Sequence, residues 1–174
     1  MPPISQLLAG PAAFGLAALL LLAPTSIGCA STLSGQVVDA QTGQPIAGAV
    51  VLGVWVYAGG APGLAHSELV GVREAETDAE GRFALESLAG LPVEERITVY
   101  KSGYVAWSNL FSFPPLRRRE KTAARAQIRL EPFPPGESHW EHMLFIDLAR
   151  SSGLYGNESN PKLQTAIDRE RRMR

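Results

Sequence analysis

The strongest constraint on the fold is an alternation of apolar and polar side chains with a period of two, which runs from residue 33 to residue 130. Side chains of a β-strand point alternately to its two faces, so this period indicates strands with one buried face. Seven short segments carry the pattern, separated by turns rich in Gly, Asp and Pro: 33–38, 49–57, 69–76, 82–88, 96–101, 104–113 and 126–130. They predict an all-β fold, a seven-stranded antiparallel β-sandwich.

The second segment is apolar on both of its faces. One face carries Val50, Leu52, Val54 and Val56, and the other carries Val51, Trp55 and Tyr57. A strand without a polar face is expected either at the centre of its sheet or under a cover from outside the sandwich. In the third segment we expect Val70 and Val72 to point into the core together.

The composition fits one small domain. The chain has 174 residues, of which 45% are hydrophobic, and this is enough for a single core. The formal net charge of −1 argues against nucleic-acid binding through overall electrostatics. Cys29 is the single cysteine, which excludes an internal disulfide and a cysteine-rich zinc site.

The first 30 residues have the features of an export signal. Residues 6–23 contain no charge, and the apolar run within them has the length of a signal-peptide core. Residues 26–29, Ser-Ile-Gly-Cys, resemble a bacterial lipobox, in which the thiol of Cys29 is acylated and this residue becomes the new N-terminus. We therefore expect a lipoprotein anchored in a membrane through lipid on Cys29, with Ala30 favouring the periplasmic face of the outer membrane.

Two other interpretations of this segment stay open. Cleavage by the general signal peptidase among the small residues Gly28, Cys29 and Ala30 would release a soluble periplasmic protein, and an uncleaved segment would remain as an anchor. The predicted organisation is a signal peptide over 1–28, a short tether over 29–32, the sandwich over 33–131, and a Pro-rich linker with a helical tail over 132–174.

Three stretches of the sandwich resemble successive motifs of the carboxypeptidase regulatory-like domain. They are Gly-Gln-Val-Val-Asp at 35–39 with Thr-Gly-Gln-Pro-Ile-Ala-Gly-Ala-Val-Val at 42–51, Thr-Asp-Ala-Glu-Gly-Arg-Phe-Ala-Leu at 77–85, and Ile-Thr-Val-Tyr-Lys-Ser-Gly-Tyr at 97–104. Their order along the chain is that of the family. The resemblance implies a transthyretin-like (prealbumin-like) sandwich that serves as a non-catalytic accessory module of peptidases, transporters or surface proteins.

A first helix is predicted after the Pro-rich linker. Ser138 is a suitable capping residue, and the helix extends to about Ser151 with Trp140, Leu144 and Leu148 at a spacing of four.

A second helix is predicted from Asn160, with Pro161 at its first position and an apolar face of Leu163, Ala166 and Ile167. We expect one or both helices to pack over the sandwich, on the outer face of the strand 49–57. The alternative is a docking helix for a partner.

Two groups of residues are candidate metal ligands, but no metal ion or cofactor is predicted from either. His139 and His142 share a helix face, but no third ligand is evident, so we expect surface or capping histidines. Asp78 and Glu80 precede Gly81, but the further oxygen ligands of a calcium loop are missing, so a turn is predicted.

No catalytic residue is predicted. The sequence has no Gly-x-Ser-x-Gly motif, and no His-x-x-Glu followed by a later His of the metallocarboxypeptidase kind. Tyr100, Tyr104, His139 and His142 are of the types that hold iron in sandwich dioxygenases, but tyrosines at strand positions are interpreted as packing residues.

These features predict a non-catalytic cell-envelope protein, in which the sandwich is a structural or protein-interaction module. The alternative is a glycan- or peptide-binding module that uses exposed aromatic residues from this set: Trp55, Tyr57, Tyr100 and Trp107. The basic runs 117–121 and 169–174 are predicted to be solvated, with binding of anionic lipid, lipopolysaccharide or peptidoglycan as the alternative. The expected partners are the membrane and an envelope protein or glycan.

Overall fold

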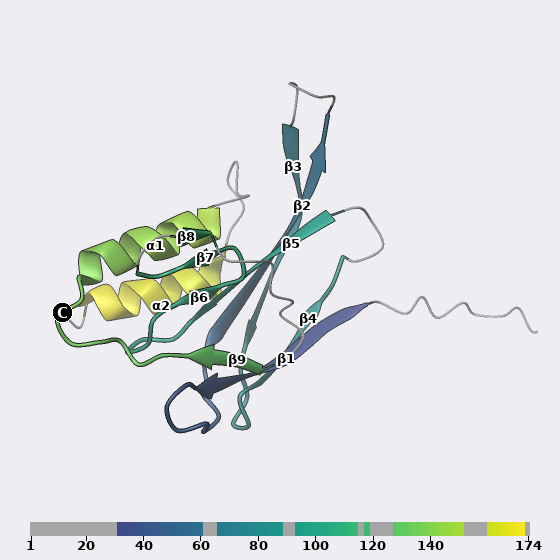
Figure 1. Cartoon of the computed structure of the whole chain (residues 1–174). Helices are drawn as coiled ribbons and strands as arrows, with labels where there is room; N and C mark the ends of the chain where they lie inside the picture. Colours follow the sequence, from purple (N-terminus) through teal and green to yellow (C-terminus); the bar gives the residue numbers. More distant parts are fainter. Residues whose placement is uncertain are drawn as a thin grey trace, which may run out of the picture.

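The computed structural model describes residues 31–60, 66–88, 93–114, 117–118, 127–151 and 160–172. Within these ranges the chain is mostly strand, and two helices follow the last strand (Figure 1). Two main sheets face each other, and the helices lie against the outer face of one of them. The expected sandwich of two sheets is confirmed, with the helices as a third layer.

The first sheet has the strand order β4-β1-β9. β1 (Thr32–Asp39) pairs antiparallel with β4 (Arg82–Glu86) and parallel with β9 (Gln127–Leu130). The prediction of a purely antiparallel sandwich is wrong at the parallel pair. β9 reaches β1 after a long excursion of the chain through the second sheet, and a connection of that kind allows the same strand direction.

The second sheet has the order β3-β2-β5-β6, with β2 (Val50–Gly59) at its centre. β2 pairs antiparallel with β3 (His66–Glu76) and with β5 (Val93–Tyr100), and β5 pairs with the short β6 (Trp107–Ser108). The hairpin of β2 and β3 projects beyond the rest of the molecule (Figure 1).

β2 contributes to two separate hydrophobic cores, one on each face. Val51 and Trp55 lie between the sheets, together with Phe83 and Ile128 from the first sheet. The opposite face packs against the helices through Val50, Leu52, Val54 and Val56. None of these β2 residues is more than 3% exposed. β2 is therefore both central in its sheet and covered from outside, which explains its two apolar faces.

A β-bulge in the hairpin separates Val70 from Val72. The pairing of β2 with β3 shifts between Trp55 and Val56, so β3 has one extra residue at Val70. Val70 packs against the core between the sheets, whereas Val72 packs against the core beneath the helices. The expectation that both point the same way is wrong, because the extra residue reverses the alternation.

The predicted sixth strand, 104–113, is interrupted in the structure. Its middle forms β6 in the second sheet, and its end forms β7 (Phe111–Ser112), which pairs with β8 (Arg117–Arg118) in a small third sheet. The described ranges thus contain nine strands where seven were predicted.

Asn109 explains the interruption. Its side-chain oxygen accepts a hydrogen bond from the backbone N–H of Ile97 (2.8 Å), and its side-chain nitrogen donates to the backbone carbonyl of Glu95 (2.8 Å). The Asn side chain therefore satisfies groups of β5 that a longer neighbouring strand would have paired.

α1 (His139–Ser151) begins where the sequence predicts. The Oγ atom of Ser138 accepts a hydrogen bond from the backbone N–H of Glu141 (3.3 Å), as a capping residue does. The buried face of α1 contains Phe145, Ile146 and Ala149. The predicted stripe at a spacing of four is not the face that packs, because α1 is apolar on two sides and spacing alone does not choose between them.

α2 (Pro161–Arg172) packs through the predicted face, with Leu163 and Ile167 fully buried. Both helices lie on the second sheet, side by side and in opposite directions (Figure 1). In the part of the chain that the structure describes, no helix has the length and apolar character needed to cross a bilayer.

The N-terminus of α2 is capped by a residue distant in sequence. The two carboxylate oxygens of Glu74, on β3, accept hydrogen bonds from the backbone N–H groups of Lys162 (3.0 Å) and Leu163 (2.9 Å). A carboxylate at this end of a helix is favoured by the helix dipole as well. Glu74 therefore joins α2 to the projecting hairpin. The helix begins at Pro161, as predicted from the capping residue Asn160.

Candidate functional site

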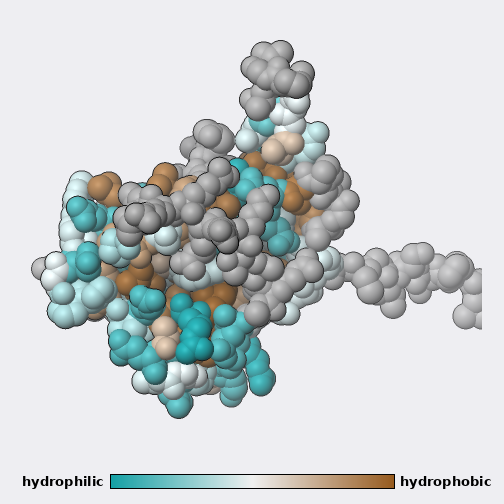
Figure 2. Space-filling view, in the orientation of Figure 1, coloured by the Kyte–Doolittle hydropathy of each residue, from teal (hydrophilic) through white to brown (hydrophobic). Residues whose placement is uncertain are grey.

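The solvent-facing side of α1 carries an apolar stripe, formed by Trp140, Leu144 and Leu148. Their side chains are 71%, 47% and 42% exposed, although the opposite side of the helix is buried. Figure 2 shows hydrophobic side chains at the surface along α1, in the upper left of the view. Glu141 is also exposed and borders the stripe. A helix that is apolar on both sides is normally covered on both sides, so the stripe is a candidate contact surface.

The aromatic residues proposed for glycan or peptide binding do not form a groove. Trp55, Tyr100 and Trp107 are between 0% and 9% exposed and belong to the two cores. Tyr57 is exposed, but it lies on the projecting hairpin, where its ring is near that of His66 (centroids 6.2 Å apart). His66 begins β3, whereas His139 and His142 are both on α1.

A polar cluster is buried between β5 and the two helices. Tyr100 donates a hydrogen bond from its hydroxyl to the carboxylate of Glu170 on α2, and Nδ1 of His139 on α1 lies 3.9 Å from the same carboxylate. Tyr100 is 1% exposed and Glu170 is 4% exposed. A buried carboxylate needs such partners. The cluster holds the three elements together, with the His139 side chain 35% exposed at its edge.

His142 is a core residue, and the expectation of a surface or capping histidine is wrong for it. It is 1% exposed, and its Nε2 accepts a hydrogen bond from the backbone N–H of Ala106 (2.9 Å). Its ring packs among those of Phe113, Phe133 and Phe145. Phe113, on the chain beyond β7, thereby binds the third sheet to α1.

The potential metal ligands within the described residues are not gathered in one place. Across the described ranges, no group of three or more His, Cys, Asp and Glu side chains is positioned to hold a metal ion. Among the four residues with iron-ligand chemistry, Tyr100 and His139 meet at Glu170. The hydroxyl of Tyr104 donates instead to Asp39 (3.0 Å).

Asp39 organises the turn at the end of β1. Its Oδ1 accepts hydrogen bonds from the backbone N–H groups of Gln41 and Thr42 (both 2.8 Å). The backbone bond from Thr42 is the main cause that lowers the pKa of Asp39; burial opposes it, and the bonds from Gln41 and Tyr104 add to it. The pKa of Tyr104 is raised by burial and by the hydrogen bond to Asp39. Asp39 and Tyr104 therefore form a clamp that fixes the turn after β1, with the pKa of Asp39 lowered and the pKa of Tyr104 raised.

An open depression of about 790 Å³ lies between the edges of the two sheets, beside β4 and β3. Three of its polar side chains form hydrogen bonds within the protein. Gln36 donates to the carbonyl of Glu80 (2.9 Å), Gln127 donates to Gln36 (3.3 Å), and Oδ1 of Asp78 accepts from the N–H of Arg82 (2.7 Å). Asp78 thus has the predicted role of a turn residue, and the depression presents no convergent free donors or acceptors from these side chains.

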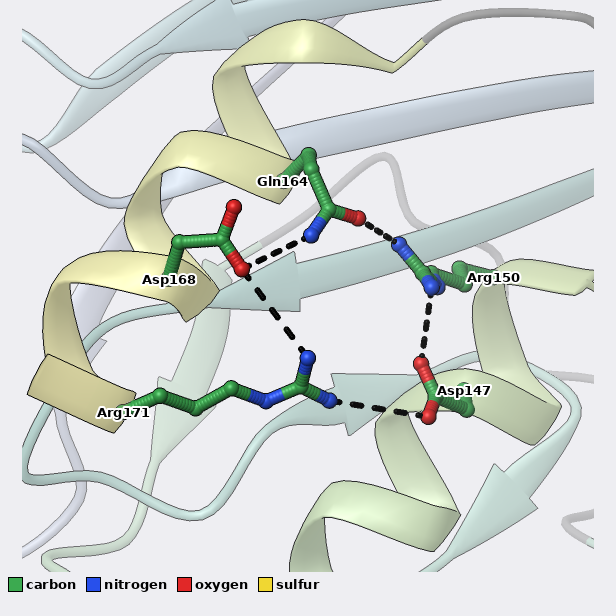
Figure 3. Close-up of polar contacts among 5 residues, drawn as sticks. All are labelled: Asp147, Arg150, Gln164, Asp168 and Arg171. Atoms are coloured by element: carbon green, nitrogen blue, oxygen red, sulfur yellow. Dashed lines mark hydrogen bonds and ion pairs between the residues drawn. The ribbon is translucent and has the colours of Figure 1, made fainter.

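α1 and α2 are joined by a chain of polar contacts (Figure 3). Asp147 forms an ion pair with Arg150 (2.9 Å) and lies 3.8 Å from Arg171, which also contacts Asp168 (3.9 Å). Gln164 donates to Asp168 (2.9 Å) and accepts from Arg150. Every charge in this chain of contacts has a partner, so the network fixes the helices relative to each other.

Two predicted features lie outside the described residues. Cys29 and the signal segment precede residue 31, and most of the basic run 117–121 follows residue 118. Nothing in the structure tests the lipid anchor.

Glu74 and Glu170 are the polar residues that the sequence analysis missed. Glu170 is three residues after Ile167 and seven after Leu163, so its spacing places it on the apolar face of α2. A carboxylate at such a position signals a buried partner and could have been found. No comparable signal exists for Glu74, whose role depends on the contact between β3 and α2.

No family model and no curated protein matches this chain.

Proposed function

We propose that this chain is a non-catalytic protein of the cell envelope, whose helix α1 binds another protein. Its sandwich is of the carboxypeptidase regulatory-like, transthyretin-like kind, and acylated Cys29 anchors it to a membrane. The motifs at 35–51, 77–85 and 97–104 and the Ser-Ile-Gly-Cys sequence support the family and the anchor. The observation that carries the interaction role is the exposed apolar stripe of Trp140, Leu144 and Leu148.

The stripe does not serve the stability of the domain itself. α1 is already held by Phe145 and Ile146, which are 0% exposed, and by the polar contacts with α2. Large exposed aromatic and aliphatic side chains in one row are typical of protein contact surfaces, where Trp often contributes most of the binding energy.

The partner that fits this surface is a protein with an apolar contact face and a basic residue at its rim. Glu141 borders the stripe and is exposed, and an opposite charge on the partner would complement it. A bilayer surface fits less well, since helices that lie on membranes carry Lys and Arg beside their apolar side. The glycan alternative loses its support, because three of its four aromatic residues are buried.

Site-specific photo-crosslinking in envelope membranes tests the proposal. A photoreactive residue at position 144 should give one discrete crosslinked product with a different protein, whereas the same residue at Thr42, an exposed turn position, should not. The double substitution Trp140→Ala and Leu148→Ala should reduce the yield at least roughly tenfold, since hot-spot residues typically contribute more than 1 kcal/mol each.

The stability of the double variant is the necessary control. Substitutions of exposed residues usually change the free energy of unfolding by no more than about 0.5 kcal/mol each, so the urea midpoint should stay close to that of the wild type. Equal products from positions 144 and 42, or a product of twice the mass of the chain, would contradict the proposed partner.

A further inference from the structure

A small groove lies on the side of α2 that faces away from α1. It has a volume of about 290 Å³, and Lys162, Thr165 and Arg169 of α2 form one wall. The opposite wall contains Gly48 and Glu76, at the near ends of β2 and β3. Because Lys162, Thr165 and Arg169 are three, four or seven residues apart, they share one face of the helix, and all three are exposed.

The cationic side chains of α2 form ion pairs on one side of the helix and none on the other, among the described residues. On the side toward α1, Arg171 is within ion-pair distance of Asp147 and Asp168 (Figure 3). On the groove side, Lys162 and Arg169 have no ion pair with any residue in the described ranges. The protein thus neutralises one side of the helix and leaves the other side positive.

The nearby carboxylates do not compensate these charges. Glu74 is occupied by the backbone N–H groups at the start of α2, and Glu170 is buried against Tyr100. Only Glu76 of this group lines the groove. A third cation lies at the rim, because Nζ of Lys101 donates to the backbone carbonyl of Gly48 (3.4 Å). The groove therefore has a positive balance, with Glu76 as the one opposing charge among its lining residues.

We propose that this groove binds a phosphate-bearing polyanion. Lys162 and Arg169 are seven residues apart, about 10 Å along the helix, so a ligand that engages both must carry more than one anionic group. Lys as a point charge and Arg as a planar fork are the usual partners of phosphate, and the Thr165 hydroxyl adds a donor between them. The phosphates come either from the headgroups of a lipid surface or from a soluble oligophosphate.

The test compares binding of the full chain to two probes. One probe is vesicles of phosphatidylcholine with and without phosphatidylglycerol, which separates anionic binding from binding through the acyl chain or the apolar N-terminal segment. The other is soluble tripolyphosphate. The measured quantity is the ratio of anionic to neutral vesicle binding, or the dissociation constant of tripolyphosphate, at fixed ionic strength.

Four single variants separate the groove from the rest of the molecule. Lys162→Gln and Arg169→Gln should each weaken anionic binding roughly fivefold, and together roughly twenty-fivefold. Arg171→Gln removes the same charge from the neutralised side and should have little effect. Glu76→Gln removes the opposing charge and should strengthen binding several-fold. Substitution of Leu144 should leave this binding unchanged, which keeps the result independent of the function proposed for α1.

The two probes identify the source of the phosphate. Preference for anionic vesicles over tripolyphosphate assigns a lipid surface, and the reverse assigns a soluble ligand. Equal effects of Arg171→Gln and Arg169→Gln, or no gain from Glu76→Gln, overturn the groove as the binding site, and so does an absence of binding to both probes.

Discussion

At the scale of single residues, Asp39 and Tyr104 show how side chains far apart in sequence fix a turn. Asp39 holds the backbone of the turn after β1, and Tyr104 reaches it from the chain after β5. The ionised carboxylate and the neutral phenol are the forms that these contacts favour. The clamp therefore couples the stability of the fold to pH at both ends of the scale.

Asp39→Asn tests the acidic side of this coupling. Because the folded state lowers the pKa of Asp39, its ionised form contributes stability above the ordinary pKa of 3.8, and this contribution is lost as the pH falls through the lower folded value. The difference in free energy of unfolding between wild type and Asp39→Asn should be largest near about pH 6 and shrink near about pH 2.5. Urea titrations at a series of pH values measure it. A difference that does not change with pH would refute the role of the carboxylate.

Tyr104→Phe tests the basic side in the same titrations. The folded state raises the pKa of Tyr104, so the neutral phenol contributes stability below the ordinary pKa of 10.0, and this is lost as the pH rises through the higher folded value. The destabilisation by Tyr104→Phe should therefore decrease above that pH.

At the scale of elements, the turns and most strands follow from the sequence, and the failures have local physical causes. The segments 33–38 and 82–88 alternate regularly and correspond to β1 and β4, and the segment 49–57, apolar on both faces, corresponds to β2. Alternation cannot reveal a bulge, a side chain that replaces a backbone partner, or the direction of β9. Each of these depends on contacts between segments distant in sequence, as in the hydrogen bonds of Asn109 to β5.

The candidate site was less predictable than the fold. The sequence gives two apolar sides for α1, and only the packing of Phe145 and Ile146 shows that Trp140 and Leu144 remain outside. The groove beside α2 requires the position of Glu76 relative to Arg169, which no spacing rule supplies.

The turn between β3 and β4 gives a prediction with a built-in comparison. Gly81 and Gly43 both have a positive φ, +70° and +73°, so alanine at either position costs about 1–2 kcal/mol. At Gly81 a Cβ atom would also lie 2.4 Å from the backbone oxygen of Val37, whereas at Gly43 nothing lies within 4 Å. Gly81→Ala should therefore lower the free energy of unfolding by at least about 1 kcal/mol more than Gly43→Ala does. Equal decreases in the free energy of unfolding, measured by urea titration, would show that the backbone of β1 moves to accommodate the added Cβ atom.

At the scale of the whole molecule, the second sheet couples the sandwich to the helices. Neighbouring residues of β2 belong to different cores, so loss of one core removes support from the other. Unfolding should therefore be a single cooperative transition that includes the helices.

Phe145→Ala examines this coupling from the helical side. It should lower the free energy of unfolding by about 3–5 kcal/mol, as expected for a fully buried Phe. In a Trp140→Phe background, tryptophan fluorescence comes from Trp55 and Trp107 in the core between the sheets. Its midpoint should shift together with the helical circular dichroism signal, whereas Leu144→Ala should move neither by much. A fluorescence midpoint that stays in place would mean that the layers unfold independently.

The parallel pairing of β1 with β9 has a consequence for the order in which the chain acquires its structure. The first strand obtains one of its two neighbours only when residues 127–130 are available, and the helices that cover β2 come later still. Contacts between such distant segments are slow to form, because a long loop must close before any of them is made. A chain that emerges from a ribosome or a translocation pore with its N-terminus first therefore cannot complete the first sheet until residues 127–130 have emerged. During that interval Val37 and Val51 are accessible to chaperones.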